Sequence, residues 1–355
     1  MLARAVQAAF GRAVVVVGQT ALAGDASSRR YVQLRLRRGG PPTVVAMLVA
    51  GDRPALTSEE LGGASATPRE LPFANVGRYL KHCGLPVPAI YLDASARDGL
   101  VLVEDVGDTT LWAASEAAPE MAVALFKQAV DLLVEMQVAG SRQPDPSCEA
   151  FKHRFDGSLS MAEVEHFVEH GIETRQGHAM PELERRELLL LLQLVCAPFG
   201  RELGVPEVLV HRDFMAWNLH VQNNRLRLID FQDALLGPDT YDLAALLTDR
   251  TTSRLITPPR EELLIQHFIT KRAEVGLGVT GDVFQRYRQC ALHRALKVIG
   301  RFYFLERVKG KSGYLAYLPC VYDVARRMFA HLPMLAPAQA IIARYVPELA
   351  PGTKA

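Results

Sequence analysis

The sequence has few of the cysteine patterns that mark secreted or zinc-binding proteins. Its 355 residues include five cysteines, Cys83, Cys148, Cys196, Cys290 and Cys320, which lie far apart and form no C-x-x-C pair. That spacing argues against a zinc site or a disulfide framework. We expect free thiols in a reducing cytoplasm.

The sequence also lacks a charge excess and a long apolar run. It has 40 Lys and Arg against 39 Asp and Glu, and 49% of its residues are apolar, so nothing indicates disorder or a nucleic-acid-binding surface. The valine run at 13–17 is too short to span a membrane. The apolar run at 188–196 follows five charged residues, so we expect a buried core helix there. No secretory signal is recognisable. We therefore expect a cytoplasmic protein without membrane or nucleic-acid partners.

The most informative feature is a polar trio within residues 210–233. It places a carboxylate at Asp213, an amide at Asn218 and a second carboxylate at Asp230. Phosphoryl transfer from ATP needs one carboxylate to orient the accepting hydroxyl, and an Asn and a carboxylate to hold the metal ions that bridge the phosphates. Mg²⁺ prefers such oxygen ligands. The trio predicts a phosphotransferase that uses ATP and Mg²⁺, with Asp213 as the catalytic residue and Asn218 and Asp230 as metal ligands.

The surrounding residues give this spacing a structural reason. A short apolar strand at 208–210 precedes the first acid, and strands at 219–221 and 226–229 flank a turn at 222–225. This hairpin would return Asp230 to the level of Asn218, so that both face one metal ion. The alternative is a chance gathering of polar residues around a hairpin.

The trio resembles the protein-kinase signature. His211-Arg-Asp and Asn218 match H-R-D-x-x-x-x-N, and Asp230-Phe matches the start of D-F-G, with Gln232 in place of Gly. The run 234–249 resembles the segment after the metal Asp in aminoglycoside phosphotransferase-like kinases, which are small-molecule relatives of the protein kinases. Within that family, residues 229–243, 25–31 and 293–300 are most similar to bacterial anomeric kinases of N-acetylmuramate and N-acetylglucosamine, which act in cell-wall recycling.

The resemblance implies an α+β, protein-kinase-like, two-lobed fold. The small β-rich N-lobe would span residues 1–105 and bind nucleotide, and the larger, mostly helical C-lobe would span 106–355 and bind the acceptor. Periodicity places strands at 30–36, 42–49, 90–92 and 100–103, and helices at 73–82, 121–138, 160–170, 181–199, 260–275, 282–307 and 314–331. Residues 52–72 read as a mobile loop, and the oligomeric state cannot be deduced.

The resemblance also implies phosphorylation of the anomeric hydroxyl of an amino sugar, giving a sugar 1-phosphate. Two alternatives remain open: a kinase of another small-molecule hydroxyl, such as an aminoglycoside or amino alcohol, and an inactive nucleotide-binding protein. The chain departs from the subgroup at 215–217, where a polar run is expected, and at Ala295, where a His is expected. The sugar therefore stays undetermined. No A-P-E segment follows Asp230, which argues against a protein kinase.

Nucleotide would be held by the N-lobe and the hinge. Before the strand at 30–36, the amides around Ser27 and Ser28 could approach phosphate oxygens, or the small residues could mark only a turn. The strand at 43–49 has no Lys to contact the phosphates, so we hypothesise that Arg29 or Arg30 replaces that charge. The main chain of Glu104 and Val106 would face adenine, although an acidic turn at a strand end would look the same.

The acceptor would be held by the C-lobe. Asp233 is a candidate to bind sugar hydroxyls or, alternatively, nearby loop amides. Arg294 and Lys297, three residues apart on a predicted helix, could meet a substrate carboxylate or pair with surface acids. We expect His211 to brace the loop through backbone rather than act as a base. Trp217 could stack on a sugar or fill the core.

Two further acids precede a predicted helix that begins near Tyr241. We expect Asp239 and Asp242 to cap that helix rather than to contact substrate.

Overall fold

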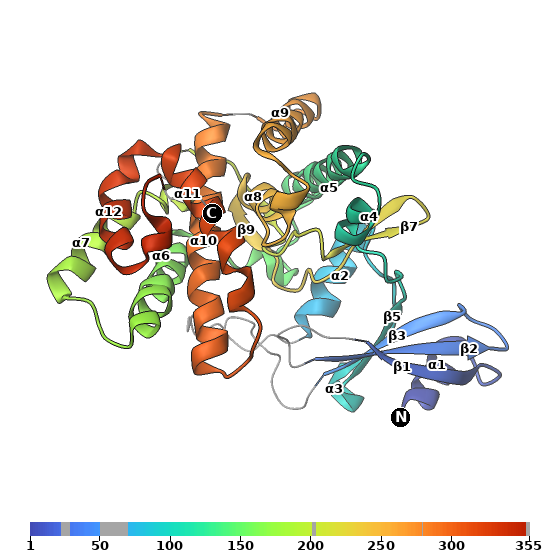
Figure 1. The fold of residues 1–355 in the computed structure, drawn as a ribbon. Helices are drawn as coiled ribbons and strands as arrows, with labels where there is room; N and C mark the ends of the chain where they lie inside the picture. Colours follow the sequence, from blue (N-terminus) through green and yellow to red (C-terminus); the bar gives the residue numbers. More distant parts are fainter. Residues whose placement is uncertain (23–28, 50–69, 201–203, 279, 353–355) are drawn as a thin grey trace.

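The computed structural model describes residues 1–22, 29–49, 70–200, 204–278 and 280–352. Ser27, Ser28 and most of the loop expected at 52–72 lie outside these ranges. Within them, the chain forms a β-rich N-terminal part and a mostly helical C-terminal part (Figure 1). This is the expected α+β, two-lobed arrangement.

The N-terminal part is built on an antiparallel sheet with the order β1-β2-β3-β5-β4. Its strands are β1 (Val15–Leu22), β2 (Arg30–Arg37), β3 (Thr43–Leu48), β4 (Ile90–Ala94) and β5 (Leu100–Glu104). Helix α1 (Leu2–Phe10) packs on one face through Ala5 and Val6, and the four-residue helix α3 (Ser95–Asp98) leads into β5.

Helix α2 (Pro72–His82) joins the N-terminal part to the large core of the molecule. Its Phe73 ring stacks on Phe231, with the ring centroids 4.9 Å apart. Gly77 permits this approach, because a Cβ there would lie 2.9 Å from the Phe231 ring. Phe231, which directly follows Asp230, is therefore packed against a helix from the N-terminal part.

The helical part is organised around the long helices α5 and α10 (Figure 1). Its helices are α4 (Leu111–Ala117), α5 (Ala122–Arg142), α6 (Gly157–His166), α7 (Glu182–Leu192), α8 (Tyr241–Leu247), α9 (Pro258–Glu274), α10 (Val283–Tyr303), α11 (Leu318–Ala330) and α12 (Ala336–Tyr345). Two of them continue as π-helical segments, α6 into Phe167–Thr174 and α10 into Phe304–Val308. Short 3-10 turns, such as Glu149–Phe151, connect other elements.

Two small sheets frame the polar trio. Strand β6 (Glu207–Val210) pairs with β9 (Leu235–Pro238), and β7 (Leu219–Gln222) pairs with β8 (Arg225–Leu228), both antiparallel. Asn223 and Asn224 close the β7–β8 hairpin with φ values of 51° and 59°. Asn tolerates this left-handed conformation, which suits a two-residue hairpin turn. The predicted hairpin is confirmed.

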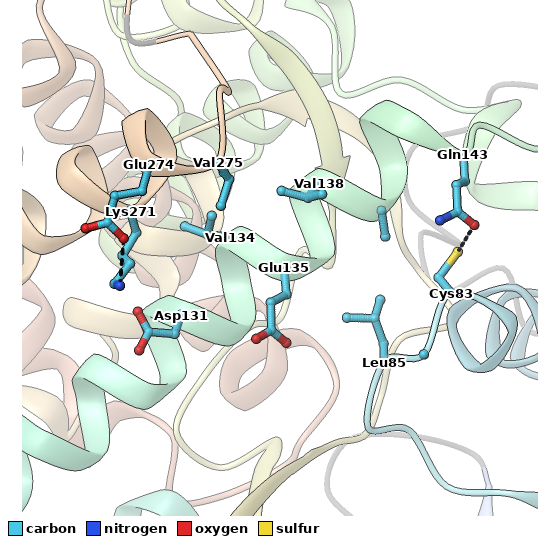
Figure 2. A pocket seen from close by; sticks show the side chains of 12 residues that line it. Cys83, Leu85, Asp131, Val134, Glu135, Val138, Gln143, Lys271, Glu274 and Val275 are labelled. Atoms are coloured by element: carbon cyan, nitrogen blue, oxygen red, sulfur yellow. Dashed lines mark hydrogen bonds and ion pairs between the residues drawn. The ribbon is translucent and has the colours of Figure 1, made fainter.

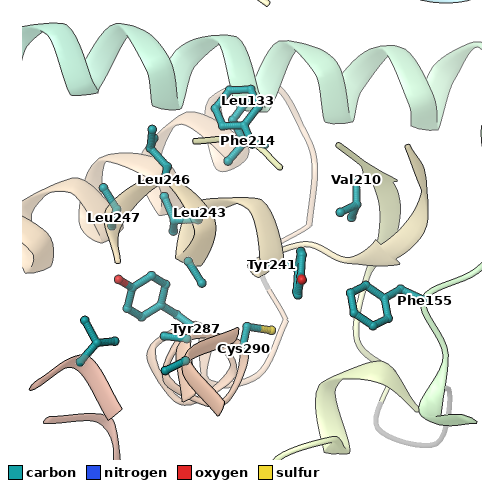
Figure 3. Close-up of a cluster of buried hydrophobic side chains, with 14 of the residues drawn as sticks. Leu133, Phe155, Val210, Phe214, Tyr241, Leu243, Leu246, Leu247, Tyr287 and Cys290 are labelled. Atoms are coloured by element: carbon teal, nitrogen blue, oxygen red, sulfur yellow. The ribbon is translucent and has the colours of Figure 1, made fainter. Parts of the chain in front are cut away.

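A buried apolar cluster lies directly beneath the loop that carries Asp213 (Figure 3). Phe214 points toward α5 and lies next to Leu133. Tyr241, at the start of α8, lies between Val210 and helix α10. Phe214, Leu133 and Tyr241 are all fully buried. The catalytic loop is thus fixed from below by close packing, which resists small displacements.

Several elements were not expected from the sequence. Helices α1, α4 and α12 and strands β1 and β9 are additions, and the helix expected at 181–199 ends at Leu192. The apolar run at 188–196 is only partly core, because Leu190 is 65% exposed. In the described residues, every helix is too short or too polar to cross a bilayer.

Candidate active site

The loop between β6 and β7 carries the catalytic motif and is braced by His211. This side chain is fully buried, and its Nε2 lies 3.0 Å from the carbonyl oxygen of Ile229. Its Nδ1 accepts a hydrogen bond from the Asp213 amide at 3.3 Å. These contacts assign the proton to Nε2. Burial lowers the pKa of His211, so the ring stays neutral. The expected bracing role is confirmed.

Asp213, Asn218 and Asp230 converge at one place. The Asn218 Nδ2 donates to the Asp213 carbonyl oxygen at 2.8 Å and lies 3.5 Å from Asp230 Oδ2. The Ile229 amide donates to the Asn218 carbonyl at 3.0 Å, which ties the two halves of the motif together. Since Nδ2 is turned toward Asp213, the amide oxygen of Asn218 points away from that contact.

The electrostatics of Asp230 suit a bound cation. Burial and the charges of Asp213 and Asp233 together raise its pKa to about 6, against the opposing hydrogen bond from Gln232 and charge of Arg29. A divalent ion would relieve this repulsion between carboxylates. The described residues hold no cluster of three or more His, Cys, Asp or Glu side chains that could form an all-protein cage. Asn218 and Asp230 instead fit the Mg²⁺ mode, in which few protein ligands combine with phosphate oxygens.

Gln232 connects Asp230 to Asp233. Its Nε2 donates to Asp230 Oδ1 at 2.9 Å and to Asp233 Oδ2 at 3.1 Å. This side chain therefore bridges two carboxylates, a contact that sequence reasoning missed because it noted Gln232 only as a missing Gly. Asp233 lies beside the trio, as its three-residue spacing from Asp230 requires.

Asp242 anchors the catalytic loop, and the expectation that it caps a helix was wrong. Its carboxylate accepts hydrogen bonds from the amides of His211 at 2.6 Å and Arg212 at 3.0 Å. Burial raises its pKa to about 6, and the neighbouring His211 opposes that rise. The first residue before α8 is Thr240, whose side chain makes no capping bond. Only tertiary folding brings β6 beside the start of α8, so no local sequence signal marked this role.

Asp239 also has another role than the expected cap. Its carboxylate lies between the guanidinium groups of Arg286, at 3.1 Å, and Arg272, at 3.5 Å. These fully buried charges tie the start of α8 to α9 and α10.

Arg294 and Lys297 face the back of the catalytic loop. The Arg294 Nη1 donates to the Arg212 carbonyl at 2.9 Å, and the residue is only 7% exposed. The Lys297 Nζ lies 2.6 Å from Glu163 Oε1, and its side chain is 26% exposed. Both are engaged with protein groups, one in the loop backbone and one in a buried acid.

On the nucleotide side, the structure separates the two candidate arginines. Arg29 is 7% exposed, whereas Arg30 faces outward on β2. The charge of Arg29 lowers the pKa of Asp230, in opposition to the larger effect of burial, so the guanidinium is near the metal acid. It also hydrogen-bonds Tyr31. Where kinases carry the phosphate-binding lysine, β3 has buried aliphatic residues such as Met47.

The hinge residues end β5. The Glu104 side chain forms a two-point ion pair with Arg227, at 2.9 and 2.6 Å. Its carboxylate is therefore engaged within the protein, which leaves only its main chain as a candidate to contact adenine. Gln222 donates to the Asp105 carbonyl at 3.1 Å. Val106 is buried at the start of the helical part. These contacts hold the hinge backbone against the β7–β8 hairpin.

Trp217 is packed sideways against protein. Its ring stacks on Trp112 with centroids 5.7 Å apart, and its Nε1 donates to Thr251 Oγ1 at 3.3 Å. Of the two alternatives, this geometry favours packing beneath the loop.

A separate cavity of about 560 Å³ lies between α5, the end of α9 and the turn after α2 (Figure 2). Leu85, Val134 and Val138 form its apolar wall, and Asp131 and Glu135 project from α5 at its edge. None of the trio lines it. The cavity is not part of the phosphotransfer site.

The arrangement of two lobes with a carboxylate, an amide and a second carboxylate between β6 and β9 defines a phosphotransferase of protein-kinase-like fold. The sequence pattern of the "Phosphotransferase enzyme family" matches residues 19–276. The chain belongs to this family.

Two kinases with the same name are similar to this chain over most of its length. The chain is 30% identical over 335 residues to an N-acetylmuramate/N-acetylglucosamine kinase of Neisseria meningitidis, covering 92% of this chain and 90% of the relative. It is 29% identical over 288 residues to a protein of the same name from Pseudomonas putida, covering 80% and 79%.

Solved structures confirm the fold. A microcompartment-associated aminopropanol kinase superposes with a TM-score of 0.59 at 13% identity, covering 90% of this chain and 94% of that one. An ADP-bound aminoglycoside phosphotransferase gives a TM-score of 0.55 at 16% identity, covering 88% and 95%.

Proposed function

We propose that this phosphotransferase moves the γ-phosphoryl group of ATP to the anomeric hydroxyl of N-acetylmuramate or N-acetylglucosamine, giving the sugar 1-phosphate. The observation that carries the proposal is the grouping of Asp213, Asn218 and Asp230. Asn218 Nδ2 donates to the main-chain carbonyl of Asp213 at 2.8 Å and lies 3.5 Å from Asp230 Oδ2, and burial and the charge of Asp213 both raise the pKa of Asp230. The names of the relatives from Neisseria and Pseudomonas point to the acceptor. A cytoplasmic location fits such a metabolite kinase.

Each member of the trio has a distinct role. Asp213 accepts a hydrogen bond from the anomeric hydroxyl and holds it in line with the γ-phosphate. The amide oxygen of Asn218 and the carboxylate of Asp230 hold Mg²⁺. Bound there, the ion would neutralise charge on the phosphate oxygens. Orientation by Asp213 matters more than its basicity, because proton loss is late in a loose transition state.

Nucleotide is held from the N-terminal side. Arg29 supplies the positive charge that β3 lacks, supported by its burial beside Asp230, whereas the outward-facing Arg30 contributes less. Ser27 and Ser28, which lie outside the described residues, are the candidates to bind the phosphates through their amides, and the main chain of Glu104 and Val106 is the candidate to bind adenine. Glu104 is suited to this because its side chain is already fixed by Arg227.

The acceptor lies on the C-terminal side of the trio. Asp233, fixed by Gln232, binds a sugar hydroxyl. Lys297 meets a substrate carboxylate such as the lactyl group of N-acetylmuramate while it also pairs with Glu163; its side chain, 26% exposed, supports this role. Arg294 supports the site from behind through the Arg212 carbonyl.

A transfer assay tests this proposal. Purified protein is incubated with ATP, Mg²⁺ and N-acetylmuramate, N-acetylglucosamine, an aminoglycoside or ethanolamine, and products are identified by phosphorus NMR. A phosphate on the anomeric carbon of either amino sugar supports the proposal. Transfer only to the other acceptors, or nucleotide binding without turnover, overturns it.

Two sets of variants test the roles. Asp213→Asn should lose turnover by orders of magnitude while it keeps nucleotide affinity in calorimetry. Arg29→Ala should raise the KM for ATP several-fold, and Arg30→Ala on the same strand is the matched control. An unchanged KM in Arg29→Ala would remove that residue from the nucleotide site.

A further inference from the structure

The residue just before the catalytic acid is held in an unfavourable conformation. Arg212 has a φ of 74°, in the left-handed region that non-glycine residues rarely adopt. Such a conformation is unfavourable and persists only where surrounding contacts over-determine it. Because the Arg212 backbone sets the direction in which Asp213 leaves the chain, whatever holds Arg212 also aims Asp213.

Three separate elements hold Arg212. Asp242 accepts its amide at 3.0 Å, and Arg294 donates to its carbonyl at 2.9 Å. Its guanidinium donates to Glu163 Oε1 at 3.0 Å. The first two contacts fix the backbone, whereas Glu163 on α6 fixes the side chain from a position 49 residues earlier in the sequence. A rotation of the Arg212 backbone would have to break the first two contacts and would strain the third.

Glu163 is a buried acid that the phosphotransfer reaction does not use directly. It is 3% exposed, and it contacts the Lys297 Nζ at 2.6 Å and the His293 ring at 3.9 Å, in addition to Arg212. Burial of a carboxylate is unfavourable unless cations surround it. Two cations do so here, one from the catalytic loop and one from α10.

The Glu163–Arg212 contact depends on a single hydrogen bond. Glu163 Oε2 and Arg212 Nε are both buried and make no hydrogen bond in the part of the chain that the structure describes. Arg and carboxylate can form a two-point contact, but here Glu163 Oε1 holds the Arg212 guanidinium through one nitrogen, Nη2. The hold on this side chain by Glu163 therefore depends on that one bond.

We propose that Glu163 is a positioning residue for phosphoryl transfer, which aims Asp213 by clamping the Arg212 side chain while Lys297 holds Glu163 in place. This inference rests on the proposed kinase function. It assigns a role in turnover to α6, an element that contributes no group to the trio.

The test is Glu163→Gln, which keeps the size of the side chain and removes its charge. A misaimed Asp213 should lower kcat by roughly tenfold to a hundredfold, because small displacements of a catalytic group have such effects. The KM for ATP should stay within twofold, because nucleotide is bound on the other side of the cleft. Glu165→Gln, an exposed acid on the same helix, is the matched control. A Glu163→Gln enzyme with wild-type kcat would overturn the proposal.

A double-mutant cycle separates positioning from general stability. If Glu163 acts through Arg212, Arg212→Met combined with Glu163→Gln should lower kcat no further than the worse single variant. Independent effects that multiply would contradict the clamp. Glu163→Asp, which keeps the charge, should recover part of the lost kcat.

Hydrogen exchange provides a readout that needs no acceptor. Amides 211–214 should exchange faster in Glu163→Gln than in wild type, while amides of the distant β2–β3 pair stay unchanged. If the wild-type protein phosphorylates no amino sugar, the proposed function fails, and the exchange experiment still tests the clamp. Unchanged exchange at 211–214 would overturn the clamp alone.

Discussion

The ion cluster around Glu163 predicts a pH-dependent stability difference between the wild-type protein and Glu163→Gln. Burial by itself would raise the pKa of Glu163, but Lys297 and Arg212 outweigh it and lower the pKa from 4.5 to about 2. A lowered pKa of an acid means that its ionised form stabilises the fold above the unfolded pKa. This stabilisation is lost as pH falls toward the folded pKa.

The size of the effect follows from the two pKa values. A shift of 4.5 to about 2 corresponds to roughly 3 kcal/mol at pH 7. At pH 3.5, where an unfolded Glu would be mostly protonated, linkage leaves about 2 kcal/mol. Glutamine mimics the protonated acid, so the wild-type advantage over Glu163→Gln should be constant above about pH 5 and should shrink below it.

Urea unfolding between pH 3.5 and 8, followed by far-ultraviolet circular dichroism, measures this difference. Glu165→Gln should show no comparable advantage for wild type at any pH, because Glu165 is exposed. A wild-type advantage that stays the same from pH 8 to 3.5 would refute the reasoning, since it would mean that Glu163 contributes by shape and not by charge.

Two further substitutions test the loop anchor and the packing beneath it. Asp242→Asn should lower kcat at least tenfold with nucleotide affinity unchanged in calorimetry. The two loop amides donate hydrogen bonds to the two carboxylate oxygens of Asp242, whereas the Asn side chain would offer them one acceptor and one clashing donor. A wild-type kcat in this variant would show that the anchor is dispensable. Gly140→Ala should destabilise the protein by about 1–3 kcal/mol in urea unfolding, although Ala favours helices, because its Cβ would overlap the side chain of Leu209. Gly157→Ala, whose Cβ meets open space, is the control, and equal stability of the two variants would contradict the steric argument.

The fold was predictable where apolar and polar residues alternate along the sequence or where a short apolar run lies between turn residues. Residues 30–36 and 42–49 alternate or run apolar between turn residues, and both are strands in the structure, as β2 and β3. Strand β9 (Leu235–Pro238) could not be seen this way, because it contains Gly and Pro, which disfavour strands. Its pairing with β6 is imposed by tertiary structure. Strand β1 was missed because a valine run with no alternation does not distinguish strand from helix.

The site was predictable where its members are close in sequence. Asp213, Asn218 and Asp230 lie within one loop and one hairpin, so turn chemistry fixes their approach. Glu163 and Asp242 reach the same loop through helices whose rotation depends on packing of the whole core. Helical spacing placed Arg294 and Lys297 on one face of a helix. It could not show that this face contacts Arg212 and Glu163 and is not turned to solvent.

One strained backbone position lies directly before Asp213, at Arg212. Outside glycine, positive φ occurs among the described residues in surface turns at Arg38, Asn223 and Asn224, and at two site positions, Arg212 and Asp230. Asn and Asp tolerate this region, but Arg does not favour it. Arg212 is therefore kept there by its neighbours, through contacts with three separate side chains. A loop held in this way cannot relax when a neighbouring charge is lost without moving Asp213. It follows that substitutions of the bracing residues should reduce turnover as well as stability.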